Sequence, residues 1–229
     1  MPDFQRFAEI KPSANVRACQ SKETAVTKAL NAQEDVEILE KCPVFKGYFR
    51  VDRYRLRHKR FDGGWSAPME REIFERGHAA ALLPYDPVLN QFVVCEQFRA
   101  GALAAGLSPW QLEVVAGIIE EGETPEDVAR RETEEEAGLS AEELWPIQRY
   151  LVSPGGTSET VHLYLGRVSA ANAGGIFGLP SENEDIRVTA ISESQLQELV
   201  EGNKLTNAAT LIAAQWFFLN RAKIRAKWA

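Results

Sequence analysis

Short apolar runs separated by turn residues make up most of the chain from about residue 35 onward. Val36 and Ile38 alternate with acidic residues, which is the period of two expected of a half-buried β-strand. Asp62, Gly63 and Gly64 are typical of a hairpin turn between two such runs. Strands are therefore expected near residues 35–39, 47–58, 70–75, 78–86, 91–98, 111–117, 161–168 and 185–191, and around Tyr150.

Three segments have the signals of helices. The first begins at Thr124, a good N-cap followed by Pro125, and ends at Gly138. A second helix is expected from Ser192, and a third, with one apolar face, over residues 207–223. Many strands and few helices, without regular alternation of the two, indicate an α+β fold with a mixed sheet.

The charge of the chain is unevenly distributed. The 229 residues include 33 Asp and Glu against 26 Lys and Arg, for a formal net charge of −7. Residues 113–136 hold ten acids and two bases, a net −8, so the rest of the chain carries +1. A surface that follows nucleic-acid phosphates by bulk charge is normally basic. No nucleic-acid partner is therefore expected.

The cysteines and the apolar segments favour a cytoplasmic protein with no membrane partner. Cys19, Cys42 and Cys95 are widely spaced and form neither a disulfide framework nor a zinc-binding pair. The first ten residues lack the basic and apolar regions of a signal peptide. The apolar segment 211–219 is interrupted by Gln215, and it is far shorter than the about 18–20 residues of a membrane span.

Several carboxylates of the acidic segment share one predicted helix. Glu132 and Glu136 are four residues apart and lie on one face, with Glu135 close by. Like charges at this spacing repel by about a few tenths of a kcal/mol. A divalent cation such as Mg²⁺, which prefers carboxylate oxygens, would offset that repulsion. The alternative is a solvated acidic helix face, which is the usual outcome of a charge run.

A longer pattern of fixed positions favours the metal site. Its members are Gly117, then Glu123 after five residues, Arg131 and Glu132 after seven more, and finally Glu135, Glu136, Gly138 and Leu139. This spacing matches the box of the Nudix hydrolases at every fixed position, so agreement by chance is very improbable. Thr133 stands where that family usually has an aliphatic or small residue. From about residue 35 to the C-terminus the chain resembles Nudix hydrolases, most closely the bacterial ADP-ribose pyrophosphatase group.

The resemblance implies an α/β/α sandwich and hydrolysis of ADP-ribose to AMP and ribose 5-phosphate. The cofactor would be Mg²⁺, about two or three ions, with Mn²⁺ able to replace it. Residues 76–229 would form the catalytic domain and residues 35–75 an N-terminal β-region. That region would exchange strands in a homodimer. Residues 1–34 would be an extension outside the match.

The resemblance also implies roles for the box. The backbone carbonyl of Ala116 and the carboxylates of Glu132 and Glu136 would bind metal. Glu135 would be either a further ligand or a nearby surface acid. Arg131 would pair with an acid of the loop and so support catalysis.

The polar loop 178–185 would close over the substrate by resemblance. Glu182 would be the general base, which a loop carboxylate can be when the metal already acidifies the attacking water. Glu184 would add a metal contact. The alternative is a flexible acidic loop that does not contact the substrate.

A proline marks the ADP-ribose group within the family. Pro154 lies 15 residues beyond Leu139, in the string SPGGTSE over residues 153–159. The resemblance then implies that Glu159 binds hydroxyls of the terminal ribose. The alternative is an ordinary turn, which Pro-Gly-Gly would form in any case.

The remaining substrate contacts are expected from four residues. Arg71 and Arg99 match arginines that contact the substrate in the family, and a guanidinium fork suits phosphate oxygens. Gly117 would lie against the substrate. Tyr48 would stack on adenine from the partner subunit, or would be an aromatic of a core strand instead.

Two other functions compete with ADP-ribose hydrolysis. One is hydrolysis of another nucleotide sugar or a dinucleotide, such as GDP-mannose or NADH. The other is a regulator that binds ADP-ribose without cleaving it. The intact box and the lack of a basic helix-turn-helix segment disfavour the regulator.

Overall fold

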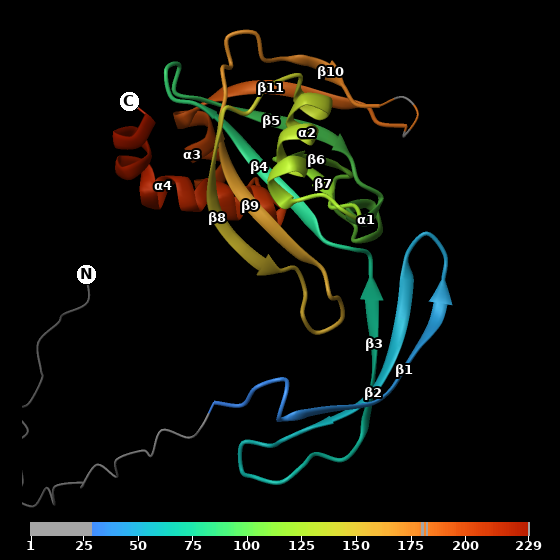
Figure 1. The fold of residues 1–229 in the computed structure, drawn as a ribbon. Helices are drawn as coiled ribbons and strands as arrows, with labels where there is room; N and C mark the ends of the chain where they lie inside the picture. Colours follow the sequence, from blue (N-terminus) through green and yellow to red (C-terminus); the bar gives the residue numbers. More distant parts are fainter. Residues whose placement is uncertain (1–28, 180, 182, 229) are drawn as a thin grey trace, which may run out of the picture.

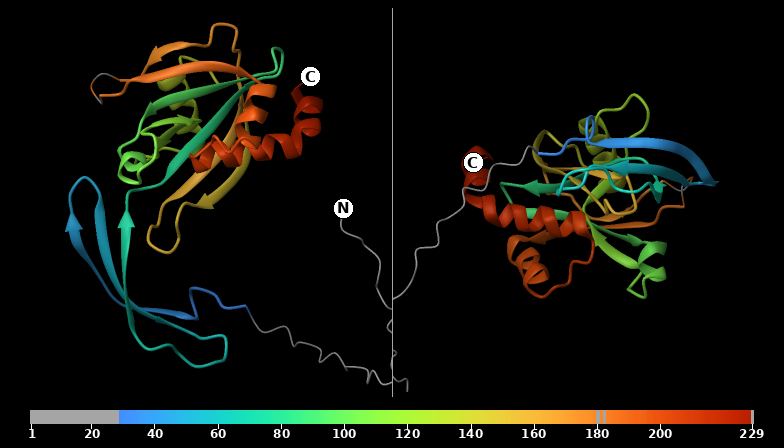
Figure 2. Two further views of the ribbon diagram at one scale, coloured as in Figure 1. Left: turned by 180° about the vertical axis from the view of Figure 1, so that it is seen from behind. Right: turned by 90° about the horizontal axis from the view of Figure 1, so that it is seen from below.

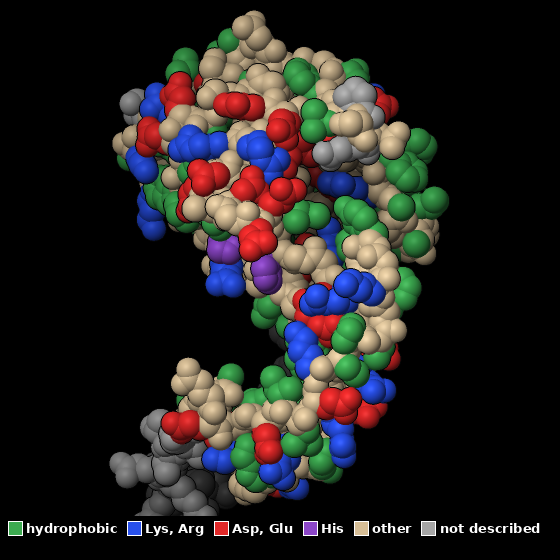
Figure 3. All heavy atoms as spheres, turned by 45° about the vertical axis from the view of Figure 1, so that its right-hand side comes forward, with side chains coloured by type: hydrophobic (Ala, Val, Ile, Leu, Met, Phe, Trp, Pro, Cys, Tyr) green, Lys and Arg blue, Asp and Glu red, His purple; other side chains and the backbone are tan. Residues whose placement is uncertain are grey.

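The computed structural model describes residues 29–179, 181 and 183–228, which form two parts (Figure 1). A three-stranded sheet projects from a larger body that holds an eight-stranded sheet and the helices. Seen from behind, the projecting sheet still stands away from the body (Figure 2). A hollow separates most of the sheet from the body (Figure 3).

The projecting sheet consists of β1 (Val36–Lys46), β2 (Arg50–His58) and β3 (Met69–Glu75), all antiparallel. Charged side chains pair across its strands, as Arg57 does with Glu37. Large apolar side chains nevertheless remain exposed on it: Ile38, Leu39, Val44, Phe45 and Tyr48. The sheet therefore buries little apolar surface against the rest of the chain.

The sheet of the body is mixed, as predicted. It contains β4 (Ala79–Asp86), β5 (Gln91–Phe98), β6 (Trp110–Glu113), β7 (Val115–Ile118), β8 (Glu143–Leu151), β9 (Thr160–Arg167), β10 (Gly175–Phe177) and β11 (Ile186–Ser192). The order is β10-β11-β5-β4-β9-β8, with β6 beside β5 and β7 beside β4. β4 and β9 are parallel, and the other neighbours are antiparallel.

One predicted strand is interrupted. The sequence predicts a single strand over residues 111–117, but β6 pairs with β5 and β7 pairs with β4. At the break, the Val114 N–H donates to Thr210 Oγ1 at 3.0 Å. The chain can therefore pass between neighbouring strands without leaving a buried donor unsatisfied. The prediction is wrong because the apolar pattern continues through the break.

Helices cover both faces of the body sheet. α2 (Pro125–Ala137) packs on one face against β4, β5 and β7, while α3 (Glu193–Glu201) and α4 (Ala208–Trp228) cover the other face. Each interface has its own buried cluster, with Val128 on the α2 side and Phe217 on the α4 side. This arrangement confirms the predicted α/β/α sandwich.

Two features of the helices differ from the sequence prediction. α4 continues past Lys223 to Trp228, because Trp228 is buried beside Trp145 and its indole N–H donates to Glu143 at 3.2 Å. The short α1 (Ala100–Ala104) was not predicted, since its five residues lack a capping side chain. In the part of the chain that the structure describes, no helix is long and apolar enough to cross a membrane.

Candidate active site

The acidic segment forms a loop followed by α2, whose ends are fixed as the sequence predicts. Thr124 Oγ1 accepts from the Asp127 N–H, and the Asp127 carboxylate accepts from the Thr124 N–H. Gly138 ends the helix with a φ of 63°, a conformation that favours glycine. Thr133 is fully buried and donates to the carbonyl of Ala129 at 2.6 Å. Threonine therefore fits this position of the box.

Arg131 holds three carboxylates of the acidic segment. Its Nε lies 3.0 Å from Glu123 Oε1, and its Nη1 lies 2.8 Å from Glu132 Oε1 and 3.1 Å from Glu135 Oε2. The hydrogen bond to Glu123 raises the pKa of Arg131 and lowers the pKa of Glu123. The predicted pairing of Arg131 with an acid of the loop is confirmed, and its catalytic role stays a prediction.

Gly117, on β7, leaves the space that Glu132 occupies. A Cβ at residue 117 would lie 1.8 Å from Glu132 Oε1 and 2.4 Å from Glu132 Cγ. Any larger residue at this position would displace the glutamate. The first glycine of the box therefore sets where this carboxylate lies.

Glu136 is the most deeply buried carboxylate of α2, with 2 % of its surface exposed. Its Oε2 accepts from the Ala116 N–H at 3.0 Å, and its Oε1 accepts from Gln97 Nε2 at 3.5 Å. Burial, followed by the charge of Glu132, raises the pKa of Glu136 to about 8. Burial also raises the pKa of Glu132. Two neighbouring acids that are costly to ionise make a site that favours a bound cation.

Two more charged side chains act on this pair of glutamates. Glu184, on the loop between β10 and β11, adds to the effect of burial and raises the pKa of both Glu132 and Glu136. Arg99 follows β5 and opposes the rise at Glu136, and it binds Glu113 at 2.8 Å through Nη2 and 3.1 Å through Nε. Glu132, Glu136, Glu184 and Arg99 therefore form one electrostatic cluster.

The loop 178–185 holds Glu184 by local contacts. Glu184 Oε2 accepts from the Leu179 N–H at 3.2 Å. Gly178 has a φ of +100°, and a Cβ there would lie 2.7 Å from Glu184 Cβ. The glycine therefore allows a close approach of the two loop strands. Glu182, the predicted general base, lies outside the described residues.

Three predicted substrate residues lie in the projecting sheet or at its junction with the body. Tyr48 is at the tip of the β1–β2 hairpin and is 89 % exposed, so the alternative of a core aromatic is wrong. Arg71 is exposed on β3, where it donates to the carbonyl of Glu70 at 2.7 Å. Glu159 is 7 % exposed and lies 3.5 Å from Arg76 Nε. Their substrate contacts stay predictions.

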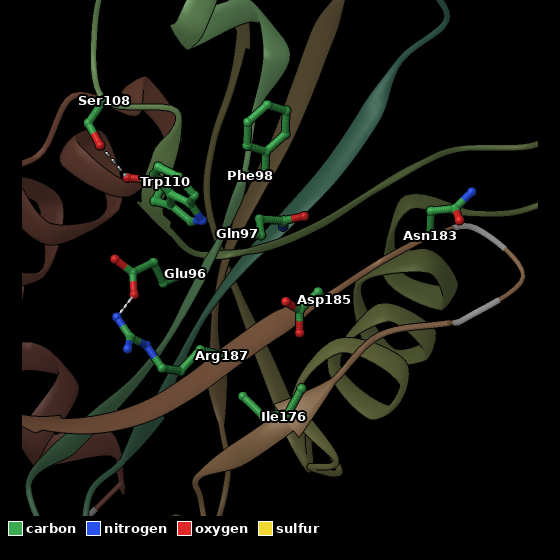
Figure 4. A pocket seen from close by; sticks show the side chains of 9 residues that line it. All are labelled: Glu96, Gln97, Phe98, Ser108, Trp110, Ile176, Asn183, Asp185 and Arg187. Carbon is green, nitrogen blue, oxygen red and sulfur yellow. Dashed lines mark hydrogen bonds and ion pairs between the residues drawn. The ribbon is translucent and has the colours of Figure 1, made fainter.

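A cleft of 660 Å³ opens at one end of the body sheet (Figure 4). Its lining residues are Glu96, Gln97, Phe98, Ser108, Trp110, Ile176, Asn183, Asp185 and Arg187. Because side chains alternate along a strand, Phe98 of β5 faces away from α2 whereas Gln97 faces toward it. Gln97 donates to Glu136 and also reaches the cleft. The cleft therefore adjoins the carboxylate cluster, and the loop 178–185 contributes to its wall.

The donor set of the cluster fits a divalent cation. Its side-chain donors are carboxylate oxygens, which Mg²⁺ prefers. On the surface of this side of the body, acidic and basic side chains are intermixed (Figure 3). Among the described residues, no three side chains of the kinds that bind metals form a ready-made cluster. Arg131 instead holds Glu132 and Glu135. Metal binding by Glu132 would therefore compete with its ion pair to Arg131.

Two residues of the site were not predicted from the sequence. Gln97 donates to Glu136 from 39 positions away, and Glu113 is the ion-pair partner of Arg99. One signal was available for Gln97. It lies on the expected strand 91–98 and precedes Arg99 by two positions, so continued alternation past the strand end would place both side chains on the same face.

Comparison with known proteins places this geometry in a family. The model of the NUDIX domain matches residues 75–215. ADP-ribose pyrophosphatase of Escherichia coli (strain K12) is 50 % identical over 197 residues, which cover 86 % of this chain and 94 % of that protein. GDP-mannose pyrophosphatase of Shigella flexneri serotype 5b (strain 8401) is 33 % identical over 167 residues, or 71 % of this chain and 79 % of that protein.

A solved structure described as an ADP compounds hydrolase supports the fold. It matches with a TM-score of 0.61 and 19 % identity, over 85 % of this chain and 98 % of that one. The box residues 117–139 lie inside the matched domain and form its loop and helix. With its box complete and most of its length matched, the chain belongs to the NUDIX family.

Proposed function

We propose that this protein hydrolyses the diphosphate of ADP-ribose to AMP and ribose 5-phosphate with the help of divalent cations. The observation that carries the proposal is the convergence of Glu132 and Glu136 beside β7, held by Arg131, Gly117 and Ala116. The relative named for ADP-ribose is 50 % identical and the one named for GDP-mannose is 33 % identical. This difference favours ADP-ribose as the substrate.

Metal binding is assigned to Glu132, Glu136 and Glu184 and to the backbone carbonyl of Ala116. Bound Mg²⁺, about two or three ions and replaceable by Mn²⁺, would neutralise the diphosphate and lower the pKa of a bound water. The mutual repulsion of these glutamates supports the assignment, because a cation would relieve it. Arg131 holds Glu132 through Nη1 and pairs with Glu135 through the same nitrogen.

The general base is assigned to Glu182. Its neighbour Glu184 acts on the charges of Glu132 and Glu136, so the loop 178–185 is within electrostatic reach of the metal ligands. A loop carboxylate can accept the proton of the attacking water if the loop closes over the substrate. The adjoining cleft of 660 Å³ gives the loop room for such a movement.

Substrate contacts are assigned to both parts of the chain. Arg99 and Gly117 border the carboxylate cluster, where the diphosphate would bind. Arg71 and Tyr48 belong to the projecting sheet, so we assign them to the active site of a partner subunit. Glu159 is assigned to hydroxyls of the terminal ribose.

A homodimer would complete this site and cover the apolar side chains of the projecting sheet. Exposed apolar patches of this kind mark interaction surfaces. Light scattering tests the proposal: a dimer is expected, and a monomer at micromolar concentration would contradict it. Tyr48 and Arg71 would then lose their assigned roles.

The activity is tested with ADP-ribose, GDP-mannose and NADH at equal concentrations in Mg²⁺. We expect AMP and ribose 5-phosphate from ADP-ribose as the preferred reaction, with the attacked phosphorus identified in ¹⁸O-labelled water. A clear preference for GDP-mannose or NADH would move the assignment to another substrate. Binding of ADP-ribose without cleavage in Mg²⁺ would favour a regulator.

A further inference from the structure

Three successive residues of the body meet three successive residues at the end of β3. The contacts are Thr157 Oγ1 to the Phe74 carbonyl at 2.9 Å, the Ser158 hydroxyl to the Glu75 carboxylate, and Glu159 Oε1 to Arg76 Nε at 3.5 Å. Each pair has the same separation in sequence, 83 positions. The two segments therefore run parallel and in register. We call residues 74–76 and 157–159 the clasp.

The backbone takes part in the clasp as well. The Phe74 N–H donates to the Gly156 carbonyl at 2.8 Å, and residues 74 and 157 form a parallel bridge. The Thr157 hydroxyl also accepts from the Glu159 N–H at 3.2 Å. Main-chain and side-chain bonds thus support each other within one short ladder.

Aromatic contacts extend the clasp into the projecting sheet. The Phe49 and Phe74 rings lie 5.0 Å apart, and the Arg76 guanidinium lies 5.6 Å from the Phe49 ring centre. Phe49 directly follows Tyr48 at the hairpin tip. A shift of the clasp would therefore move the segment that carries Tyr48.

The clasp joins two parts that otherwise have little contact. Among the elements that the structure describes, β1, β2 and β3 pack extensively only against one another. Beyond the clasp, the chain continues from β3 to β4 through Gly77, which has a φ of 84°. A single glycine linker permits many orientations of the sheet, so the clasp is what selects one of them.

We infer that Thr157, Ser158 and Arg76 are positioning residues that fix the projecting sheet on the body and so set where Tyr48 and Arg71 meet the substrate. The effect on the substrate rests on the proposed function, whereas the clasp itself does not. The inference gives the SPGGTSE string a mechanical role, in addition to the ribose contact expected of Glu159.

The first test compares Thr157→Val with Thr189→Val. Valine keeps the shape of threonine but removes its hydroxyl bonds, and Thr189 is an exposed threonine on β11. We expect Thr157→Val to raise amide hydrogen exchange in residues 74–76 by about fivefold or more, the equivalent of one lost hydrogen bond. Thr189→Val should leave it unchanged. Unchanged exchange in Thr157→Val would overturn the inference.

Kinetics test whether the clasp acts through substrate binding. We expect Thr157→Val and Arg76→Gln each to raise KM for ADP-ribose by roughly fivefold with kcat within about twofold, because they disturb positioning and not the chemical step. The increase in KM of the double variant should be smaller than the product of the increases in the two single variants. Both substitutions break the same ladder, so their effects should not be independent. Loss of exchange protection with unchanged KM would contradict the positioning role.

The two proposals can fail separately. If the wild-type protein does not cleave ADP-ribose, the proposed function fails. Hydrogen exchange and the small-angle X-ray scattering profile of Thr157→Val would still decide whether the clasp fixes the sheet. A scattering profile identical to that of the wild type would then overturn the inference.

Discussion

Phe92 and Phe45 both lie on antiparallel strands, yet Phe92 is fully buried whereas Phe45 is 59 % exposed. Phe92 is on β5, between helices on both faces of the body sheet, and its ring packs against Tyr85 and Phe217. Phe45 is on β1, which has β2 as its strand neighbour, and none of the described helices packs extensively against β1. Similar strand patterns thus lead to different burial, because the body supplies a covering layer that the described residues do not supply to the projecting sheet.

The difference extends to the chemistry of the two parts. In the body, burial raises the pKa of Glu132 and Glu136, the two residues to which we assign metal binding. In the projecting sheet, charged residues such as Arg71 and aromatic ones such as Tyr48 stay accessible. Under the proposed function, the body would therefore hold the residues that cleave the substrate, and the sheet would offer groups to a partner subunit.

The largest difference between the two parts is expected in the free energy of unfolding, when a phenyl ring is removed from each of them. Phe92→Ala should lower the free energy of unfolding by about 3–5 kcal/mol, because it leaves a cavity in a packed core. Phe45→Ala should change it by less than about 0.5 kcal/mol in the monomer, yet weaken the dimer. Urea unfolding and light scattering measure the two quantities. Equal losses of unfolding free energy under monomeric conditions would mean that both rings belong to one core.

Glu136→Gln should reduce kcat by more than about 100-fold, since even residues behind a metal ligand cost 10–100-fold. The fold should persist, because burial already favours the neutral form of Glu136 and raises its pKa to about 8. Glu134→Gln, an exposed position on the same helix, is the matched control. Steady-state rates and thermal unfolding measure both effects. Turnover at the wild-type rate in Glu136→Gln would remove this residue from the metal site.

Glycine-to-alanine changes compare steric freedom in the two parts. At Gly117 the new Cβ would lie 1.8 Å from Glu132 Oε1, and at Gly47 it would lie 2.9 Å from the end of the exposed Phe45 ring. Gly117→Ala should lower kcat by about tenfold or more, because it displaces a carboxylate that has to be placed accurately. Gly47→Ala should keep kcat within about twofold, since the Phe45 ring can move aside. Similar kcat values for the two variants would contradict the role given to Gly117.

Local signals explain what could be predicted from the sequence. Thr124 and Ser192 begin helices as expected, and each forms a capping box, which depends on residues three positions apart. The spacing of Glu132 and Glu136 likewise predicted that both lie on one helix, and both lie on α2. In each case the signal and the structure it predicts lie within a few turns of chain.

Contacts between distant segments explain what could not be predicted. The break at Val114 depends on Thr210, 96 positions away, and the clasp joins residues 83 positions apart. Gln97 contributes to the site because β5 lies beside α2. The alternation of apolar and polar residues along a strand does not indicate which distant segment that strand will contact. The sequence left both alternatives for Tyr48 open for a related reason, since a strand pattern does not show whether another layer covers it.

The smallest change in the free energy of unfolding is expected when an ion pair is broken in each of the two parts. Glu193, at the start of α3, accepts from Arg221 at 2.8 Å and from Arg225 at 2.6 Å, and it is largely buried. Burial alone would raise the pKa of Glu193, but the hydrogen bonds from Arg221 and Asn90 and the charge of Arg225 outweigh it, so its pKa is lowered. Glu37 pairs with Arg57 on the projecting sheet, where both side chains are only partly buried.

Because the pKa of Glu193 is lower in the folded state, its stabilisation is present above the unfolded value of about 4.3. It is lost as pH falls through the folded value. Glu193→Gln should therefore cost about 1 kcal/mol at pH 6, and the difference from wild type should shrink toward pH 3. Glu37→Gln should change the unfolding free energy by less than about 0.5 kcal/mol, as is usual for exposed pairs. Urea unfolding at both pH values measures these free energies. If Glu193→Gln lowers the free energy of unfolding equally at both pH values, packing and not charge joins α3 to α4.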